Sequence, residues 1–215
     1  MVATFIMSKI ICIPFIKRPF QRLDDPNYYG IKNAVNIRIP VEPGQELGAW
    51  FIRPHDNSFE YSAERRWNEV SNYLKYKDGF SKNIASSSLE ICDKSDQLSK
   101  CQKDNANSTR KPGVYLTNAN ETMILYLHGN SETRSQFHRR ELCKKIQALG
   151  IPILAIDYRG YGDSYGGFGW QTTQSSMVWD GVVAIRFLKQ YIDPSTKIIV
   201  WGHSLGTGVT LKLGR

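Results

Sequence analysis

The sequence predicts an α/β fold, with a mostly parallel sheet and helices on both of its faces. Three short, mainly apolar runs, at residues 123–127, 151–156 and 197–201, have the composition of strands that are buried on both sides. Helical patterns lie between these runs, over about residues 135–149 and 173–191. Strands and helices that alternate in this order indicate a parallel sheet, because each helix returns the chain to the same end of the sheet.

A β-hairpin is predicted ahead of the parallel strands. Residues 34–39 alternate apolar and polar side chains, which is the period of a strand, and Pro40 is expected to end it. Residues 42–45 have the composition of a turn. Residues 47–52 are expected to form the second strand of the hairpin.

One helix and one long loop are predicted between the hairpin and the first parallel strand. Trp67, Val70 and Leu74 recur at helical spacing and give a modestly amphipathic helix over about Ala63–Tyr76. Residues 81–111 are rich in Ser, Asn, Asp and Lys and have no periodicity. We therefore expect them to form a long surface loop.

The chain is expected to divide into two parts. Residues 1–33 form an N-terminal segment, and residues 34–215 form a partial α/β domain with a polar insert at about residues 55–120. Residues 1–16 are apolar, but they contain Lys9 and are fewer than the ~20 residues that cross a bilayer. This stretch is a remnant of a membrane anchor, an interfacial segment, or a strand that leads into the core.

The composition argues against several classes of site. The chain has a net charge of +8 over 215 residues, but its Lys and Arg are dispersed and no nucleic-acid motif is present. We therefore expect no nucleic-acid binding. The four cysteines form no CxxC pair and no Cys/His cluster, so we expect no metal site. No P-loop or dinucleotide fingerprint is present, and no cofactor is expected.

Two features bear on the compartment of the protein. Cys92 and Cys101 flank a short polar stretch and have the spacing to close a small loop. Asn107 and Asn120 each begin an Asn-x-Ser/Thr glycosylation sequence. Both features fit an oxidising lumen. Two free thiols and two chance matches explain them equally well.

Ser204 is the predicted nucleophile. Residues 202–206 read G-x-S-x-G, directly after a predicted buried strand and ahead of a predicted helix that Gly202 opens. This context is typical of a sharp strand-to-helix turn that presents the serine hydroxyl above the sheet in a strained backbone conformation. A side chain at Gly202 or Gly206 would clash where strand and helix pass each other. The alternative is an ordinary serine that caps the helix.

Two backbone N–H groups are predicted to form an oxyanion hole. Acyl transfer by a serine passes through a tetrahedral oxyanion that needs preorganised donors. The first is the N–H of Leu205, the residue after the nucleophile. The second comes from the loop at residues 128–130, which follows an earlier strand, and Asn130 N–H is the candidate.

The other polar residues near these motifs are expected to have structural roles. Asp157 ends a strand, but it precedes the serine, whereas the acid of this catalytic arrangement follows the serine along the chain. We expect an ion-pair and turn network beneath the site, formed by Asp157, Arg159 and Asp163. His128 is expected to order its loop, His138 to lie on a helix surface, and His203 to be structural.

Three blocks in this order resemble the α/β-hydrolase-domain family. They lie at residues 125–130, 157–164 and 201–208, and the branch they resemble most is that of the membrane-bound lysophosphatidylserine and monoacylglycerol lipases. The segments at Thr133-Arg134 and His138-Arg139 also suit that branch. The resemblance implies an α/β-hydrolase fold and hydrolysis of lipid esters at a membrane surface. It also implies an upstream anchor and a location at the luminal side of the endoplasmic reticulum membrane.

The sequence departs from the family after Ser204. Residues 205–215 contain no Asp, Glu or His, so the acid and the base of a catalytic triad are absent from the chain. We therefore expect a truncated, inactive form of the hydrolase, with residues 197–201 at an unpaired sheet edge. Two alternatives stay open: a non-catalytic isoform that binds lipid or a protein partner, and a thioesterase that removes acyl chains from proteins.

Overall fold

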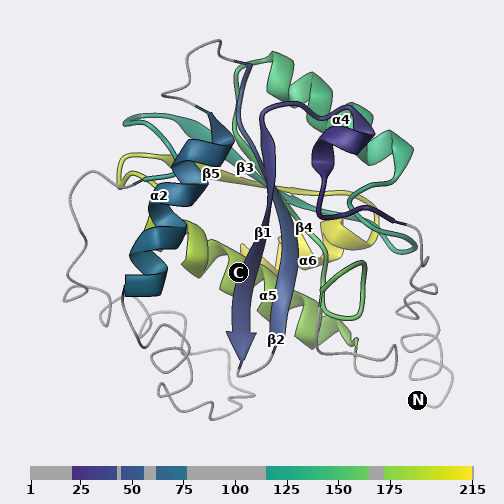
Figure 1. Ribbon diagram of the computed structural model, residues 1–215. Helices are drawn as coiled ribbons and strands as arrows, with labels where there is room; N and C mark the ends of the chain where they lie inside the picture. Colours follow the sequence, from purple (N-terminus) through teal and green to yellow (C-terminus); the bar gives the residue numbers. More distant parts are fainter. Residues whose placement is uncertain (1–20, 43–44, 56–61, 77–114, 165–171, 215) are drawn as a thin grey trace, which may run out of the picture.

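The computed structural model describes residues 21–42, 45–55, 62–76, 115–164 and 172–214. These stretches contain a short 3-10 helix, five strands and four α-helices, which Figure 1 shows along the chain. In chain order they are η1 (Pro26–Tyr29), β1 (Ala34–Glu42), β2 (Gln45–Ile52), α2 (Ala63–Tyr76), β3 (Thr122–Leu127), α4 (Phe137–Ala148), β4 (Ile153–Ile156), α5 (Gln174–Tyr191), β5 (Lys197–Gly202) and α6 (Leu205–Leu213).

The five strands form one mixed sheet in the order β1-β2-β4-β3-β5. β1 and β2 form the predicted antiparallel hairpin, and β2 continues antiparallel to β4. β3 pairs in parallel with β4 on one side and with β5 on the other. The three apolar runs therefore form the parallel part of the sheet, as predicted. Within the described sheet β5 lies at the edge, which confirms the expectation for residues 197–201.

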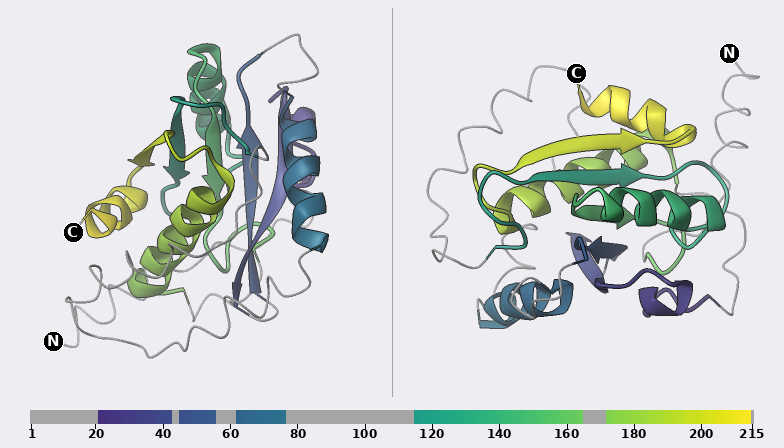
Figure 2. Two further views of the ribbon diagram at one scale, coloured as in Figure 1. Left: turned by 90° about the vertical axis from the view of Figure 1, so that its left-hand side faces the viewer. Right: turned by 90° about the horizontal axis from the view of Figure 1, so that it is seen from above.

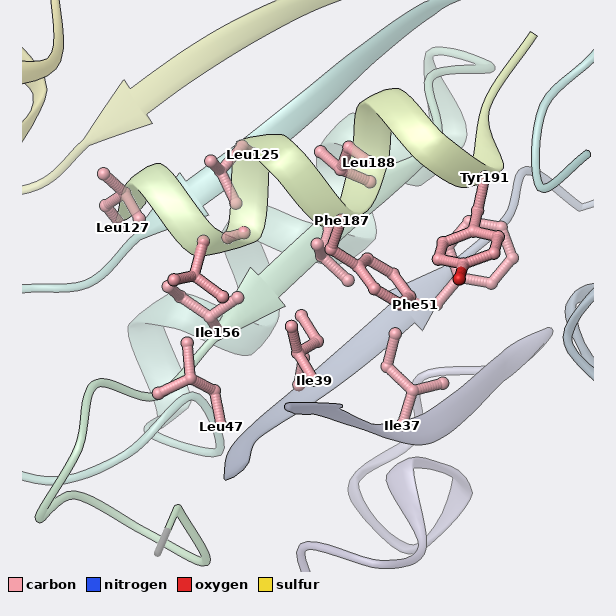
Figure 3. Close-up of a cluster of buried hydrophobic side chains, with 14 of the residues drawn as sticks. Ile37, Ile39, Leu47, Phe51, Leu125, Leu127, Ile156, Phe187, Leu188 and Tyr191 are labelled. Atoms are coloured by element: carbon pink, nitrogen blue, oxygen red, sulfur yellow. The ribbon is translucent and has the colours of Figure 1, made fainter. Parts of the chain in front are cut away.

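Each face of the sheet has a hydrophobic core. Leu125 and Leu127 of β3 belong to the core that α2, α5 and α6 cover, whereas Ile124 and Tyr126 belong to the core under α4 and η1. Figure 2 shows α4 and η1 on one side of the sheet and α2 and α5 on the other. In the larger core, side chains from β1 to β4 converge on α5 (Figure 3). Burial on both faces is the reason that β3 is apolar along its whole length.

The helices begin and end close to where local sequence signals place them. Helix α5 begins after Thr173, whose hydroxyl accepts a hydrogen bond from Ser176 N–H at 3.1 Å, while the Ser176 hydroxyl accepts one from Thr173 N–H at 2.8 Å. Gly150, with φ +78°, follows α4 and allows the chain to leave the helix. Helix α2 has the predicted bounds, and its Val70 is fully buried.

Two sequence-based boundaries are wrong. Pro40 does not end its strand, because β1 is an edge strand that tolerates a residue without an N–H, and β1 continues to Glu42 through a register shift. Gly202 does not open the last helix but is the final residue of β5, and the helix begins at Leu205. The reason is that Gly202 still pairs in the sheet with Leu127 of β3.

Several predictions fall outside the described residues. These are the loop at 81–111, the Cys92 and Cys101 pair, and the Asn107 sequence. The N-terminal segment is described only from residue 21 onward, and the division of the chain at residue 33 stays a prediction. Among the described helices, none has the length and apolar character needed to cross a bilayer.

The buried ring of Phe51 provides a test of the larger core. Phe51 is fully buried among side chains of the strands and α5, so Phe51→Ala should lower the free energy of unfolding by about 3–5 kcal/mol. The measurement is urea denaturation followed by circular dichroism. Phe137→Ala is the matched control, because Phe137 is 67% exposed and its loss should cost about 0.5 kcal/mol or less. Equal losses in the two variants would contradict the assigned core.

Candidate active site

Ser204 lies in the two-residue connection between β5 and α6. Its φ and ψ are +52° and −115°, a conformation that costs energy for a residue with a Cβ. The predicted strained turn is therefore confirmed. The side chain is exposed and makes no capping hydrogen bond to α6. This contradicts the alternative that Ser204 is an ordinary helix cap, and it leaves the hydroxyl open to solvent at the carboxyl end of the strand.

The two glycines that flank this turn have no room for a side chain. A Cβ on Gly202 would lie 2.3 Å from the carbonyl oxygen of Gly206, and a Cβ on Gly206 would lie 2.1 Å from the carbonyl oxygen of Leu127. Both obstacles are backbone atoms, which cannot rotate away as a flexible side chain can. The predicted close passage of strand and helix is confirmed, and it brings the beginning of α6 against the end of β3.

The loop after β3 lies directly beside the serine, as predicted. His203 N–H donates a hydrogen bond to Leu127 O at 3.0 Å, which joins the two strand ends. A Cβ on Gly129 would lie 3.1 Å from both Ser204 Cβ and His203 Nδ1. The absence of a side chain at Gly129 therefore lets the loop and the serine turn approach each other.

The two predicted oxyanion donors lie on the two segments that meet here. Leu205 is the first residue of α6, where N–H groups have no partner within the helix. Neither Leu205 N–H nor Asn130 N–H donates a hydrogen bond to another described residue. The side chain of Asn130 is occupied, because its Oδ1 accepts a hydrogen bond from Tyr161 Oη at 2.9 Å. The oxyanion role of the two N–H groups stays a prediction, and the geometry leaves both available for it.

The three histidines near the site differ in exposure. His128 is fully buried, its ring packs against Tyr158 and Tyr161, and its Nδ1 lies 2.6 Å from Gly129 O. These contacts fit the expectation that His128 orders its loop. His138 and His203 are exposed, and their ring centroids lie 5.3 Å apart. Partial burial, with the nearby charge of Arg139, lowers the pKa of His138 from its ordinary value.

Arg134 is the centre of the ion-pair network beneath the site. Its side chain is fully buried and forms ion pairs with Asp157 and with Asp163, the second at 2.7 Å. Its N–H also donates to Asp157 Oδ1 at 2.7 Å, and Asp163 has a second partner in Arg38 of β1 at 2.9 Å. Burial alone would raise the pKa of Asp157, but the Arg134 charge and the His128 contact hold it below its ordinary value. His128 Nε2 lies 3.2 Å from Asp157 Oδ1 without hydrogen-bond geometry.

The predicted network of three charged residues is wrong in one member. Asp157 and Asp163 share Arg134, but Arg159 pairs with Asp180 of α5, at 2.7 Å. The Arg159 backbone N–H donates to the same carboxylate at 2.9 Å. Arg159 pairs with Asp180 rather than with Asp157 or Asp163 because Asp180 is fully buried on the face of α5 that meets the Arg159 turn. The Arg159 guanidinium compensates the buried charge of Asp180.

Sequence reasoning gave no separate role to Arg139, which proves to support the loop after β3. Arg139 donates to the carbonyl oxygens of Gly129, Asn130, Ser131 and Thr133. A signal for it was present: Arg139 shares the buried face of α4 with Cys143 and Ile146, at positions where an amphipathic helix normally has apolar residues. Cys143 is a free thiol, and burial raises its pKa to about 12, so it is not a reactive cysteine.

A surface hollow of about 470 Å³ lies elsewhere on the molecule, between η1, the beginning of β1 and α2. Its lining includes Asp24, Asp25, Asn36, Glu64 and Trp67. None of the predicted catalytic residues lines it, so it is separate from the site at Ser204. Within the described residues, no group of three or more His, Cys, Asp or Glu side chains is placed to hold a metal ion.

The lowered pKa of Asp157 predicts acid sensitivity. A carboxyl group whose folded-state pKa lies below its unfolded value stabilises the fold above that unfolded value, ordinarily 3.8, and the stabilisation is lost as the pH falls through the folded-state pKa. The free energy of unfolding should therefore fall below about pH 4. Asp157→Asn should lower the free energy of unfolding by about 3–5 kcal/mol at pH 7, because Arg134 is left buried without its partner. The free energy of unfolding of this variant should also fall less as the pH is lowered. Asp24→Asn, at an exposed carboxylate, should change neither quantity.

The contact at Gly206 predicts opposite effects of two glycine substitutions in one helix. Gly206→Ala should lower the free energy of unfolding by about 1–3 kcal/mol, because its Cβ overlaps the backbone of β3. Gly208→Ala should raise it by about 0.5–1 kcal/mol, since no atom lies within 4 Å of its Cβ and alanine favours a helix. Urea denaturation of the two variants measures both. A neutral Gly206→Ala would show that the helix does not pass the strand as closely as described.

Part of the chain is similar to a known protein family. Residues 118–215 match the family described as serine aminopeptidase, S33. The chain is similar to the lysophosphatidylserine lipase ABHD12 of Mus musculus, with 40% identity over 211 residues, which cover 98% of this chain and 41% of the relative. It is also similar to the lipase of the same name from Danio rerio, with 28% identity over 211 residues that cover 98% of this chain and 42% of the relative. The chain thus spans about two fifths of the length of these relatives.

A solved structure shares the fold. The esterase Pf2001 of Pyrococcus furiosus superposes with a TM-score of 0.50 at 17% sequence identity, over 87% of this chain and 48% of the esterase. The superposition, the sequence match and the strained serine turn at the end of β5 agree with one another. This chain therefore has an α/β-hydrolase fold, and its residues 118–215 are similar to the serine aminopeptidase S33 family.

Proposed function

We propose that the protein is a serine hydrolase of lipid esters, of the lysophospholipase type, with Ser204 as its nucleophile. The observation that carries the proposal is the turn at Ser204, where a strained backbone holds an exposed, uncapped hydroxyl next to Leu205, whose N–H has no described hydrogen-bond partner. Strain of this kind persists where the surrounding structure imposes it for function. The lipid class is supported by the relatives in mouse and zebrafish, both named as lysophosphatidylserine lipases.

The geometry suits acyl transfer. Ser204 Oγ attacks the acyl carbonyl carbon, and the carbonyl oxygen gains the negative charge of a tetrahedral intermediate. Leu205 N–H and Asn130 N–H bind that oxygen, and the loss of one such donor generally costs about 3–4 kcal/mol of transition-state stabilisation. The intermediate collapses to an acyl-serine ester and releases the protonated alcohol. Water then attacks the ester, and the fatty acid leaves with Ser204 restored.

The step that deprotonates Ser204 needs a general base within hydrogen-bond reach. The eleven residues after Ser204 contain no histidine and no carboxylate. We propose that an acid and a base complete the site, as in the triads of other serine hydrolases. The competing function is a non-catalytic form that binds lipid or a protein partner.

We also propose that the site acts at a membrane surface, on the luminal side of the endoplasmic reticulum. Asn120, which begins a glycosylation sequence, is exposed in a turn just before β3, so its side chain is accessible to a glycan. Phe137 is 67% exposed, and its neighbour His138 contacts His203 beside the nucleophile. Phe137 thus adds exposed apolar surface one residue from His138, which supports a role in binding an acyl chain. A monoacylglycerol is the second substrate class we propose.

Ser204→Ala in the full-length native protein tests the catalytic proposal. Wild-type protein should hydrolyse lysophosphatidylserine in detergent micelles and react with a fluorophosphonate at Ser204, as read by mass spectrometry. Ser204→Ala should lose both the hydrolysis and the fluorophosphonate labelling, with kcat reduced by about 10⁴-fold or more. Ser195→Ala is the matched control, because it removes an exposed serine hydroxyl from the opposite end of β5. It should keep wild-type turnover.

Turnover of three kinds of substrate distinguishes the proposed substrate classes from one another. Faster turnover of a monoacylglycerol than of lysophosphatidylserine would shift the assignment to the other lipid class. Turnover of an S-acyl cysteine peptide alone would identify a protein thioesterase. If the wild-type protein hydrolyses none of these and Ser204 is not labelled, the catalytic proposal fails and the binding function takes its place.

A further inference from the structure

Arg139 is a buried cation that binds backbone oxygens rather than a carboxylate. Its side chain is 2% exposed, and its guanidinium donates to the carbonyl oxygens of Gly129 at 3.2 Å, Asn130 at 3.0 Å, Ser131 at 2.7 Å and Thr133 at 2.8 Å. Among the described residues it forms no ion pair. Asp157 and Glu132 act on its charge only through space, so the direct contacts that offset the burial of this cation come from backbone oxygens.

The loop that Arg139 holds is strained. Ser131 and Glu132 have φ values of +46° and +61°, in the left-handed region that residues with a Cβ seldom adopt. Two consecutive residues of this kind keep their conformation only when the surroundings impose it. The carbonyl oxygens of Asn130 and Thr133, on the two sides of the strained pair, both accept hydrogen bonds from the Arg139 guanidinium, which acts as a clamp across the turn.

One of the clamped oxygens belongs to the peptide unit that carries the predicted oxyanion donor. Gly129 O and Asn130 N–H are the two ends of one planar peptide group, so they point in opposite directions. Gly129 O contacts Arg139 Nη2 at 3.2 Å and His128 Nδ1 at 2.6 Å. A carbonyl held toward α4 turns the N–H of its peptide away from α4. Gly129 itself lies against Ser204, so that N–H is next to the site of reaction.

Hydrogen bonds to the carbonyl also strengthen the N–H as a donor. Donation to an amide oxygen polarises the amide, and bonds in such a chain reinforce one another, most of all in a dry environment. A guanidinium is a charged donor and polarises more than a neutral one. Arg139 therefore affects both the direction and the donor strength of Asn130 N–H.

We propose that Arg139 is a positioning residue, which orients and polarises the Gly129–Asn130 peptide so that Asn130 N–H binds the oxyanion of the lipid-ester reaction. This inference rests on the proposed function of Ser204. Arg139 touches neither the substrate nor the nucleophile, and its effect passes through the peptide. The chemical class it serves is any acyl ester or thioester whose carbonyl oxygen becomes negatively charged in the transition state.

Arg140 is the matched control. It follows Arg139 in α4 and is partly buried, but its guanidinium packs on the rings of Tyr29 and Phe137 and donates to Tyr29 O at 3.5 Å. Substitutions at Arg140 therefore make the same change of side chain in the same helix, at a residue with no described contact to the loop after β3.

The kinetic experiment compares Arg139→Lys and Arg139→Met with Arg140→Lys and Arg140→Met in the full-length native protein. The Arg139 variants should lose kcat by about 10- to 100-fold, less than the 10²- to 10³-fold expected when an oxyanion donor is removed outright. KM should stay near the wild-type value, because the interaction is made in the transition state. Affinity for an acyl trifluoromethyl ketone, which forms a tetrahedral oxyanion on serine, should fall by the same factor as kcat.

A second readout does not depend on turnover. In protein labelled with ¹⁵N-asparagine, the Asn130 amide is assigned by its disappearance in Asn130→Ser. Its ¹H–¹⁵N resonance should move in Arg139→Lys and stay in place in Arg140→Lys. Thermal unfolding of each variant shows whether the fold is retained, and the lysine variants remain informative if a methionine variant does not fold.

The outcomes separate the two proposals. Wild-type protein that neither turns over nor reacts at Ser204 contradicts the proposed function, and the Asn130 resonance then still decides whether Arg139 controls that peptide. If wild-type protein is active, equal kcat in Arg139→Lys and wild type overturns the positioning role. A loss that is the same in the Arg139 and Arg140 variants, or a rise in KM alone, also overturns it.

Discussion

The contact between Gly206 and the carbonyl of Leu127 sets the geometry of the whole site. Because helix α6 crosses the end of β3 with no space for a Cβ, only two residues connect β5 to the helix. That short connection forces Ser204 to a positive φ and leaves its side chain exposed. The same crossing places Leu205 N–H, which has no hydrogen-bond partner among the described residues, directly after the serine. The exposed serine and the free N–H of Leu205 thus follow from one close approach of backbone segments.

Two buried arginines hold the loops around this crossing in different ways. Arg134 is compensated by carboxylates and joins the turn after β4 to β1 and to the segment before α4. Arg139 is compensated by carbonyl oxygens and holds the loop after β3. The ion pairs of Arg134 stabilise the packing of these segments through charge, whereas the hydrogen bonds of Arg139 fix the direction of peptide groups. A neutral side chain of similar size would fill the same space in either place but would provide neither effect.

The sequence allowed prediction of those parts that depend on local pattern. The bounds of α2 and the order of the three apolar strands follow from periodicity, and the turn at Ser204 follows from glycine spacing. Errors occurred where tertiary position decides the outcome. Pro40 is tolerated because β1 is an edge strand, and Arg159 pairs with Asp180, which lies on another element. Spacing places Arg139 on the buried face of α4, but its partners could not be foreseen, since they are carbonyls whose direction depends on the fold.

Backbone strain in the described residues is concentrated at the site. Of the residues other than glycine with a positive φ, Asn33 and Asn120 are of a type that tolerates this region, whereas Ser131, Glu132 and Ser204 are not. These three lie in the two segments that meet at the nucleophile. Each is held by contacts from outside its own segment. The guanidinium of Arg139 holds the loop, and the close contact between Gly206 and the Leu127 carbonyl holds the serine turn. Rigid elements on both sides therefore offset the strain, and the polar groups are already oriented before a substrate arrives, which is the condition under which oriented dipoles stabilise a transition state without reorganisation.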